Sequence, residues 1–291
     1  MRRGTGARSL IAFLGPFVFL LVAFQYVPIA AMLVNSTRSY NLLTPTRWTY
    51  VGIGNFTRML GDPIAIQALV VTTTFTVGLV VCGVVLGLVL AVVINRPIRG
   101  IAFFRGSIFA PVVTSAVVVA TMWTFMLEPT HGLINAILAT VHLGPLAFLT
   151  SASQALPSIL MMTVWEQVGF SMVLFLAGLQ MIPSDYYDAA AVDGAGTLQQ
   201  FRHITLPLLR RTTLMVVIVM TTFAFQTFTP AYIMTQGGPN KATQFFVYEI
   251  YQQAFTFLNP GYASALSVVL MGIILIVAAV QLRLLRTDWS Y

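Results

Sequence analysis

Charged residues are scarce in this chain of 291 residues, and their scarcity argues against a soluble fold. Asp, Glu, Lys and Arg together make up 8% of the residues, whereas hydrophobic residues make up 58%. A soluble domain usually carries about 25% charged residues, so the composition predicts an integral membrane protein. The net charge of +7 could suggest nucleic acid. The arginines cluster in short loops beside apolar stretches, however, so they indicate membrane topology, and no nucleic-acid partner is expected.

Cysteine and lysine each occur once. Cys82 lies inside an apolar run, which excludes a disulfide framework and a thiolate metal site. A P-loop needs a lysine preceded by Gly and followed by Ser or Thr, but Lys241 lies between Asn240 and Ala242. We therefore expect no catalytic residue, metal or cofactor in this chain. If transport is driven by ATP, a partner chain binds the ATP and its magnesium.

Six apolar stretches are long enough to cross a bilayer, which requires about 20 residues each. They predict one all-α transmembrane domain over residues 1–291, without an internal repeat. Gly83 and Gly87 have the spacing that lets membrane helices approach closely. The stretch 128–155 is interrupted by Gly and Pro, so it is expected to lie along the membrane interface. The predicted spans cover residues 9–34, 68–94, 106–127, 157–181, 212–234 and 263–282.

The distribution of arginine predicts the orientation. Six spans place both termini on one side, and that side holds eleven basic residues against four on the other. Basic residues concentrate in cytoplasmic loops, so both termini and the loop 182–207 are predicted to be cytoplasmic. The eleven are Arg2, Arg3, Arg8, Arg96, Arg99, Arg105, Arg202, Arg210, Arg211, Arg283 and Arg286; the four are Arg38, Arg47, Arg58 and Lys241.

The loop 182–207, IPSDYYDAAAVDGAGTLQQFRHITLP, is a polar insert between apolar spans. Its run of alanines favours a helix, and Asp193-Gly194 is a turn dipeptide that ends it. Thr197 followed by Gln200 is typical of a capping box that opens a second helix. The pattern predicts two short helices joined by a sharp glycine corner, a rigid knob suited to docking on a partner. The alternative is a loop that packs only on its own bundle.

This loop closely resembles the EAA loop of binding-protein-dependent ABC importers, in particular the carbohydrate and polyol-phosphate permeases of the maltose-transporter type. The main departure is Asp188, where the family usually has Glu; the charge is kept and the side chain is one methylene shorter. Further resemblance covers GIGNF at 52–56, LAGLQMIP at 176–183, YIMTQGGP at 232–239, and IYQQAF with NPGYASA within 250–265. The loop positions that match are Ile182, Pro183, Ala189, Ala190, Asp193, Gly194, Ala195, Phe201, Leu206 and Pro207.

The resemblance implies a type I importer permease with six transmembrane helices in the plasma membrane of a prokaryote. Its implied partners are a second homologous permease, a dimer of ATPase subunits, an extracytoplasmic substrate-binding protein and membrane lipid. The loop would be the surface that couples to the ATPase. The residues assigned to that coupling are Asp188, Ala189, Ala190, Asp193, Gly194, Ala195, Phe201 and Pro207.

Four residues are candidates for the solute path. Glu166 is ionisable and lies about mid-span, which makes it a candidate functional residue, although a bundle-interior carboxylate that orders the fold is an equal alternative. Gln226, Phe228 and Tyr232 offer an amide and aromatic faces of the kind that bind polyols. An aromatic belt at the membrane interface would explain Tyr232 as well.

We therefore predict a transport subunit, not an enzyme, that imports a sugar or related polyol. No Arg or Lys falls inside a predicted span, whereas a phosphate group would favour a basic path. Glycerol-3-phosphate or a glycerophosphodiester is therefore the second choice of solute. An ion-coupled secondary carrier is the alternative from another class; such carriers often show inverted repeats and buried charges. A membrane scaffold that transports nothing is a third reading.

Overall fold

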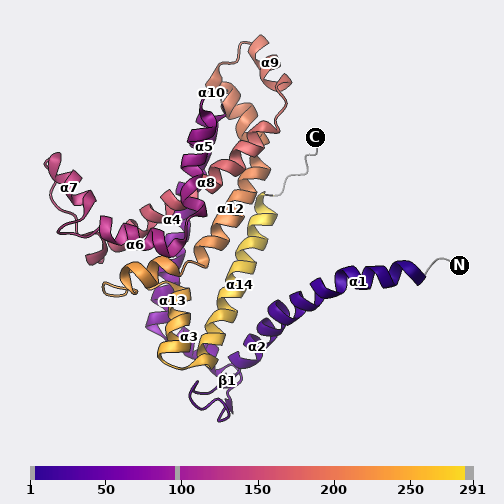
Figure 1. The fold of residues 1–291 in the computed structure, drawn as a ribbon, viewed down its shortest axis with the longest axis vertical. Coiled ribbons are helices and arrows are strands. Elements are labelled where there is room, and N and C mark those ends of the chain that lie inside the picture. Colours follow the sequence, from indigo (N-terminus) through magenta and orange to yellow (C-terminus); the bar gives the residue numbers. More distant parts are fainter. Residues whose placement is uncertain (1–3, 96–98, 286–291) are drawn as a thin grey trace. The chain divides into compact units, whose positions relative to one another are not determined.

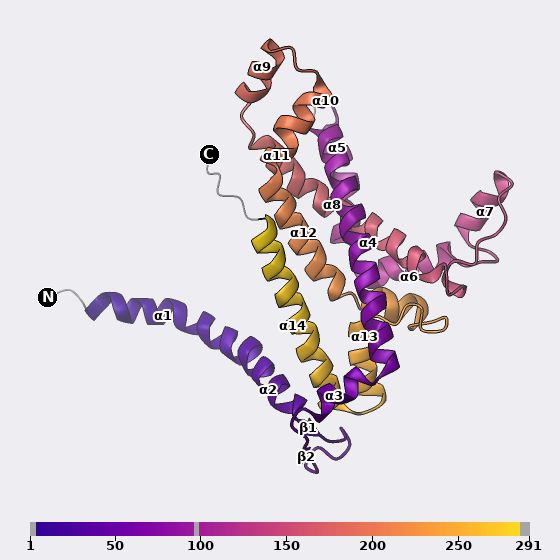
Figure 2. The same cartoon turned by 180° about the vertical axis from the view of Figure 1, so that it is seen from behind.

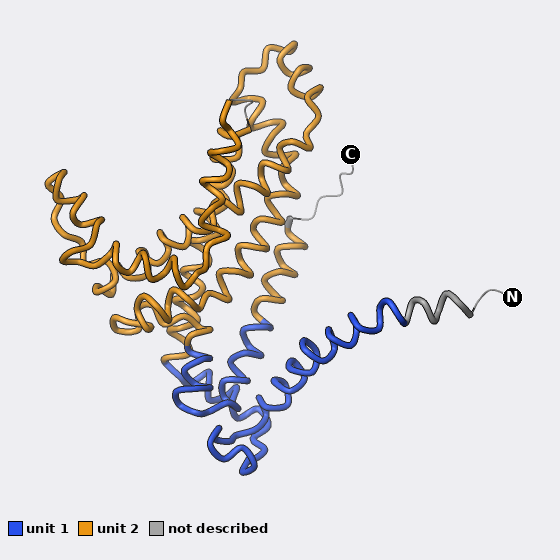
Figure 3. The backbone as a smooth tube through the Cα atoms, in the orientation of Figure 1, with its two compact units in different colours: residues 1–63, 249–272 blue, residues 64–248, 273–291 orange. Residues whose placement is uncertain are grey.

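The computed structural model describes residues 4–95 and 99–285, and helices dominate them (Figure 1). The chain divides into two compact units (Figure 3). Unit 1 comprises residues 1–63 and 249–272, and unit 2 comprises residues 64–248 and 273–291. Four of the arginines used to predict the orientation, Arg2, Arg3, Arg96 and Arg286, lie outside the described residues.

Unit 1 begins with a long apolar helix. Helix α1 (Gly4–Leu21) continues through the π-helical turn η1 (Val22–Tyr26) into α2 (Val27–Ser36), and its last 25 residues, Ala12–Ser36, are apolar enough to span a membrane. A short antiparallel pair follows, β1 (Arg38–Ser39) with β2 (Thr49–Tyr50), and then α3 (Gly54–Leu60). The Asn55 amide donates to the carbonyls of Ser36 and Arg38, at 2.8 and 2.9 Å, and so ties α3 to the end of α2.

The second segment of unit 1 includes the π-helical turn η6 (Gln252–Thr256) and the first half of α14 (Pro260–Leu285). Tyr262 donates a hydrogen bond of 2.8 Å to Asp62, and the guanidinium of Arg58 lies 4.1 Å from the centre of the Tyr262 ring. These contacts fasten the start of α14 to the residues that follow α3.

Unit 2 contains the remaining apolar helices and the polar loop. In Figures 1 and 2, α9 and α10 lie at one end of the unit and α6 and α7 project to one side of it. In chain order the elements are α4 (Pro63–Ile94), α5 (Ile101–Phe109), η2 (Ala110–Val113), α6 (Ala116–Met126), α7 (Leu133–Thr140), η3 (Phe148–Thr150), α8 (Ala155–Gln180), α9 (Asp185–Val192), α10 (Thr197–Gln200), η4 (Phe201–Thr205), α11 (Leu206–Leu208), α12 (Arg210–Phe225), η5 (Ala231–Thr235) and α13 (Phe246–Tyr251), followed by α14.

The predicted class, an all-α membrane protein with six spans, agrees with the structure. Within residues 4–95 and 99–285, four helices are long and apolar enough to cross a bilayer, and the number rises to six if each of two bent helix pairs counts as one span. Helix α8 covers the predicted span 157–181 closely, while α4 and α14 begin earlier than predicted. Helix α12 ends at Phe225, well before the predicted boundary at 234, because the chain turns at Gln226.

The span predicted over 106–127 is not one straight helix. Helix α5 starts at Ile101, so Arg105 lies inside a helix and not in the preceding loop, and its guanidinium donates to the Ile94 carbonyl at 3.0 Å. The segment bends by 97° before α6. Pro111 has no N–H to continue an α-helix, and Thr114 adopts an extended conformation with ψ of 146°. The helical pattern therefore restarts at Ala116.

Helix α8 packs closely against its neighbours in unit 2. A Cβ atom built on Gly87 of α4 would lie 2.6 Å from Ser171 Cβ of α8, so the close approach predicted for Gly87 is present. On the opposite side of α8, a Cβ on Gly169 would collide with the Ile108 carbonyl of α5. Gly178 is seven residues from Ser171 and so lies on the same side of the helix as Ser171, and a Cβ there would collide with Thr212 of α12. The helix that carries Glu166 is thus enclosed by three others.

Candidate functional site

The polar loop opens with helix α9 (Asp185–Val192), which starts two residues after Pro183. Asp185 and Asp188 lie in its first turn, where the positive end of the helix dipole stabilises a carboxylate. Asp188 is exposed, and within the described part of the chain it has no basic partner in an ion pair. Its carboxylate therefore points to water and is accessible to another protein.

The glycine corner at Gly194 is present as the sequence predicts. Gly194 has φ of +80°, a left-handed conformation that glycine adopts readily and other residues adopt at a cost. The Ala195 N–H donates to the Ala190 carbonyl at 2.8 Å, and the Gly194 N–H donates to the Ala191 carbonyl at 3.0 Å. These two bonds form a Schellman motif, which satisfies the last carbonyls of α9 and turns the chain.

The cap of the second helix differs from the prediction by one residue. Helix α10 begins at Thr197, but its N-cap is Gly196, whose N–H donates to Gln199 Oε1 at 2.9 Å. The predicted partner, Gln200, instead donates to the Ala195 carbonyl at 3.2 Å. The reason is that glycine can occupy an N-cap, so the N3 position falls on Gln199.

The inner side of the loop is braced by side chains. The hydroxyls of Tyr187 on α9 and Thr205 on η4 are hydrogen-bonded at 3.0 Å. Phe201 begins η4 and is half-buried, whereas Pro207 lies in α11 and is exposed. The brace holds α9 against the π-helical turn and keeps the two short helices at a fixed angle.

The outer side of the loop combines carboxylates with exposed apolar side chains. Asp188, Ala189 and Asp193 are exposed, and a hollow of about 360 Å³ lies between α9 and η4, lined in part by Ala190, Asp193 and His203. Two residues that the sequence reasoning missed stand on either side of the corner: Val192 is 89% exposed and Leu198 is 78% exposed. The sequence feature that could have identified them is an apolar residue close to a turn in an otherwise polar loop.

Glu166 and Gln226 lie at comparable depths on neighbouring helices of unit 2. Helices α8 and α12 meet where Gly178 approaches Thr212. At a rise of 1.5 Å per residue, Glu166 lies about 18 Å and Gln226 about 21 Å from that meeting point. Glu166 is buried, with 5% of its surface exposed, whereas Gln226 at the end of α12 is exposed. No hydrogen bond between the two side chains is present in the described residues.

The predicted aromatic residues form a cluster among themselves. The rings of Phe228 and Tyr232 stack with centroids 5.3 Å apart and planes inclined by 17°, and Tyr248 packs against both at 6.2 and 6.3 Å. Tyr248 is almost fully buried, whereas Tyr232 remains 41% exposed. The cluster therefore presents Tyr232 as its accessible member, with Tyr248 buried beside it.

The chain has many relatives of known family. The sequence model of the family described as "Binding-protein-dependent transport system inner membrane component" matches residues 83–287. The "Probable ABC transporter permease protein YurN" of Bacillus subtilis is 35% identical over 94% of this chain and 96% of its own length. The sn-glycerol-3-phosphate transport system permease protein UgpA of Agrobacterium fabrum is 33% identical over 95% and 94%.

Two further similarities are informative. The sulfoquinovosyl glycerol transport system permease protein SmoG of Agrobacterium fabrum is 32% identical over 95% of this chain and 90% of its own. Among solved structures, a bacterial ABC transporter involved in the import of the acidic polysaccharide alginate has a chain that superimposes with a TM-score of 0.85 over 98% of both chains, at 21% identity. At that identity the likeness speaks for the fold alone.

Proposed function

Because this chain belongs to the family of binding-protein-dependent transport system inner membrane components, we propose that it is the permease subunit of an ATP-driven importer for a sugar or related polyol. The family establishes an ABC transporter permease in the membrane. Membership of this family therefore excludes the two alternative functions, the ion-coupled secondary carrier and the scaffold that transports nothing. What is proposed is the coupling surface, the assembly, the orientation and the solute.

The observation that carries the coupling role is the exposed knob built around Gly194. It is rigid, because a Schellman motif and the bond between Tyr187 and Thr205 hold its two helices. Its outer side offers the carboxylates of Asp188 and Asp193, which suit arginine or lysine on a partner. Asp193 ends α9, where the helix dipole disfavours a negative charge, so a cation from a partner would relieve that cost.

The partner on this surface is the ATPase, which supplies the bound ATP and magnesium. The knob then lies in the cytoplasm, and both termini lie on the same side. A second homologous permease completes the path, and an extracytoplasmic binding protein delivers the solute. A related solved structure, the alginate transporter in complex with a periplasmic protein carrying an alginate pentasaccharide, supports such an assembly.

The solute class rests on the relatives and on the path residues. UgpA and SmoG are described as transporting sn-glycerol-3-phosphate and sulfoquinovosyl glycerol, both rich in hydroxyls. Glu166 and Gln226 can exchange hydrogen bonds with hydroxyl groups, and Tyr232 can stack on a sugar ring. A phosphate group in the solute would need a cationic side chain to bind it. Arg105, the one cationic side chain in α5, donates instead to the carbonyl of Ile94 at the end of α4. A neutral sugar is therefore preferred to glycerol-3-phosphate or a glycerophosphodiester.

The coupling role is tested with the full transporter in sealed vesicles. Gly194→Pro or Asp193→Arg should leave the chain inserted in the membrane but separate ATP hydrolysis from uptake. Pro fixes φ near −65° and cannot adopt the corner, and Arg reverses the charge that faces the partner. Normal uptake by both variants would refute docking through this loop.

The solute is tested on the cognate binding protein by thermal shift with sugars, oligosaccharides, sn-glycerol-3-phosphate and glycerophosphodiesters. The best ligand is then followed into vesicles that carry the whole transporter. We expect a neutral sugar or oligosaccharide to give the largest shift and to be taken up. A response to the phosphate compounds alone would select the second candidate instead.

A further inference from the structure

The segment 128–154, which connects α6 to α8 on the side of the membrane opposite to the knob, carries a second surface; we call it the α6–α8 excursion. Its centre is helix α7 (Leu133–Thr140), which packs against α6 within unit 2. At 1.5 Å per residue these eight residues extend about 12 Å, far short of the hydrocarbon core of about 30 Å. The chain therefore passes from α6 through the excursion to α8 without crossing the membrane in between.

One face of α7 is aliphatic and exposed. Leu133, Ile137 and Val141 follow one another at intervals of four residues, and they are 55%, 56% and 61% exposed. Residues four apart lie on the same face of a helix. The chain has no Asp, Glu, Lys or Arg between Glu128 and Glu166, so the exposed face of α7 itself carries no acidic or basic side chain for pairing with a soluble protein.

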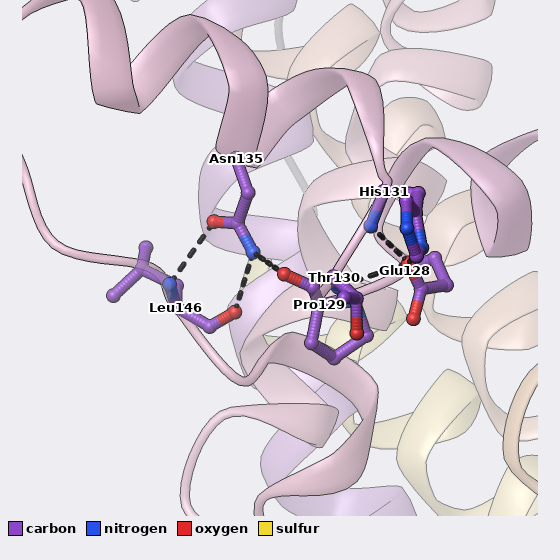
Figure 4. Close-up of polar contacts among 6 residues, drawn as sticks. All are labelled: Glu128, Pro129, Thr130, His131, Asn135 and Leu146. Carbon is purple, nitrogen blue, oxygen red and sulfur yellow. Dashed lines mark hydrogen bonds and ion pairs between the residues drawn. The ribbon is translucent and has the colours of Figure 1, made fainter.

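The polar groups of the excursion are satisfied from within. The buried Asn135 amide donates to the carbonyls of Pro129 and Leu146, each at 2.9 Å, and accepts from the Leu146 N–H at 3.0 Å (Figure 4). Gln154 accepts from the Phe148 N–H at 2.8 Å. Backbone groups in contact with lipid must find partners inside the protein, and three loop groups here depend on a single buried side chain.

The excursion has polar ends. Glu128 accepts hydrogen bonds from the backbone N–H groups of Thr130 and His131 (Figure 4). The N–H of His131 is the main reason that the pKa of Glu128 is below its usual value, so the carboxylate is charged at neutral pH. His131 precedes α7 and His142 follows it, and both are exposed. A polar group at each end of an aliphatic helix suits a helix that lies at the boundary between headgroups and acyl chains.

Helix α6 also has an exposed apolar face. Val118, Met122 and Phe125 are 58%, 42% and 73% exposed and share one face of that helix. Helix α6 belongs to a bent pair that is apolar enough to span the membrane. The exposed face of α7 therefore follows closely in the chain after a helix whose own exposed apolar face belongs to a candidate membrane span.

We propose that the α6–α8 excursion is an interfacial anchor whose Leu133, Ile137 and Val141 face inserts into the outer leaflet of the bilayer. The occupant of this surface is lipid, at the level where acyl chains meet headgroups. The anchor fixes the outer ends of α6 and α8 relative to the membrane while the knob at the opposite end is free to follow a partner.

Because the chain has a single native cysteine, Cys82, its replacement leaves a background in which each new cysteine is the only site for a label. In a Cys82→Ala background, Leu133→Cys, Ile137→Cys and Val141→Cys are spin-labelled one at a time in the assembled transporter in lipid nanodiscs. Collision rates with oxygen, which concentrates in lipid, and with a water-soluble nickel complex are then measured. Leu43→Cys in the turn between β1 and β2, 76% exposed, is the aqueous reference, and Ala120→Cys on α6, fully buried, is the reference for protein cover.

We expect the ratio of oxygen to nickel collisions at 133, 137 and 141 to exceed the ratio at 43 several-fold. Low collision rates with both reagents, as at 120, would show that another protein covers the face. High nickel rates, as at 43, would show that the face lies in water. Either outcome overturns the proposal. Because the labels occupy three separate positions, a variant that fails to assemble leaves the other two to decide.

Discussion

Replacement of Gly194 by alanine should weaken the coupling surface through the backbone alone. A Cβ atom at Gly194 would meet nothing within 4 Å, so the substitution creates no collision. The backbone there has φ of +80°, and a left-handed conformation costs an alanine about 1–2 kcal/mol. If the partner has to restore the corner on docking, that cost lowers the affinity by about 5–30-fold.

The assay is the dissociation constant between the purified permease complex and the ATPase, measured beside uptake in vesicles. Gly196→Ala is the matched control: it makes the same chemical change two residues away, where φ is −72° and a Cβ would lie 4.0 Å from the nearest atom, Gln199 Oε1. We expect affinity and uptake to fall for Gly194→Ala and to stay normal for Gly196→Ala. Gly194→Asn should lose less, because asparagine tolerates the left-handed region. Equal behaviour of the two alanine variants would refute the argument.

Three further changes have expected outcomes. Gly169→Ala should lower the melting temperature in detergent, because the new Cβ collides with the Ile108 carbonyl and overpacking costs about 1–3 kcal/mol; Gly272→Ala, with nothing within 4 Å, is its neutral control. Asn135→Leu should leave the Leu146 N–H and two carbonyls unpaired, at about 1–3 kcal/mol for each group, and faster hydrogen exchange and proteolysis confined to 128–147 would show it. Glu166→Gln should raise the KM of uptake with an unchanged melting temperature if the carboxylate contacts the solute; a fall in melting temperature would assign Glu166 to the fold.

The sequence predicted the knob well because its conformation depends on local rules. Ala189 and its neighbours favour a helix, and Asp193-Gly194 ends one, so no distant contact was needed to place the corner. The cap was misplaced by one residue because Gly196 and Thr197 are both acceptable N-caps. Only the backbone of Gly196, turned towards Gln199, distinguishes them.

The shape of the third span could not be predicted in the same way. Its apolar composition is that of one helix, and Pro111 close to the start of a membrane span is no reason to expect a bend of 97°. The segment before the bend also packs through its Ile108 carbonyl against Gly169 on α8, a contact between residues far apart in the chain that the sequence does not show. The place of Tyr248 in the aromatic cluster could not be predicted for the same reason, since Tyr248 reaches Phe228 and Tyr232 only in the fold.

The glycine corner has a consequence for how this surface can evolve. Its turn is made by main-chain hydrogen bonds at Gly194 and Ala195, and the outer side chains Asp188, Val192 and Leu198 take no part in those bonds. Substitutions at these three positions can therefore retune partner choice while the angle between the helices is inherited unchanged. Asp188, where the loop departs from the EAA pattern that it resembles, is at one of these positions. After a duplication of the whole transporter, the two copies can therefore come to prefer different partner subunits while both keep the same corner at Gly194.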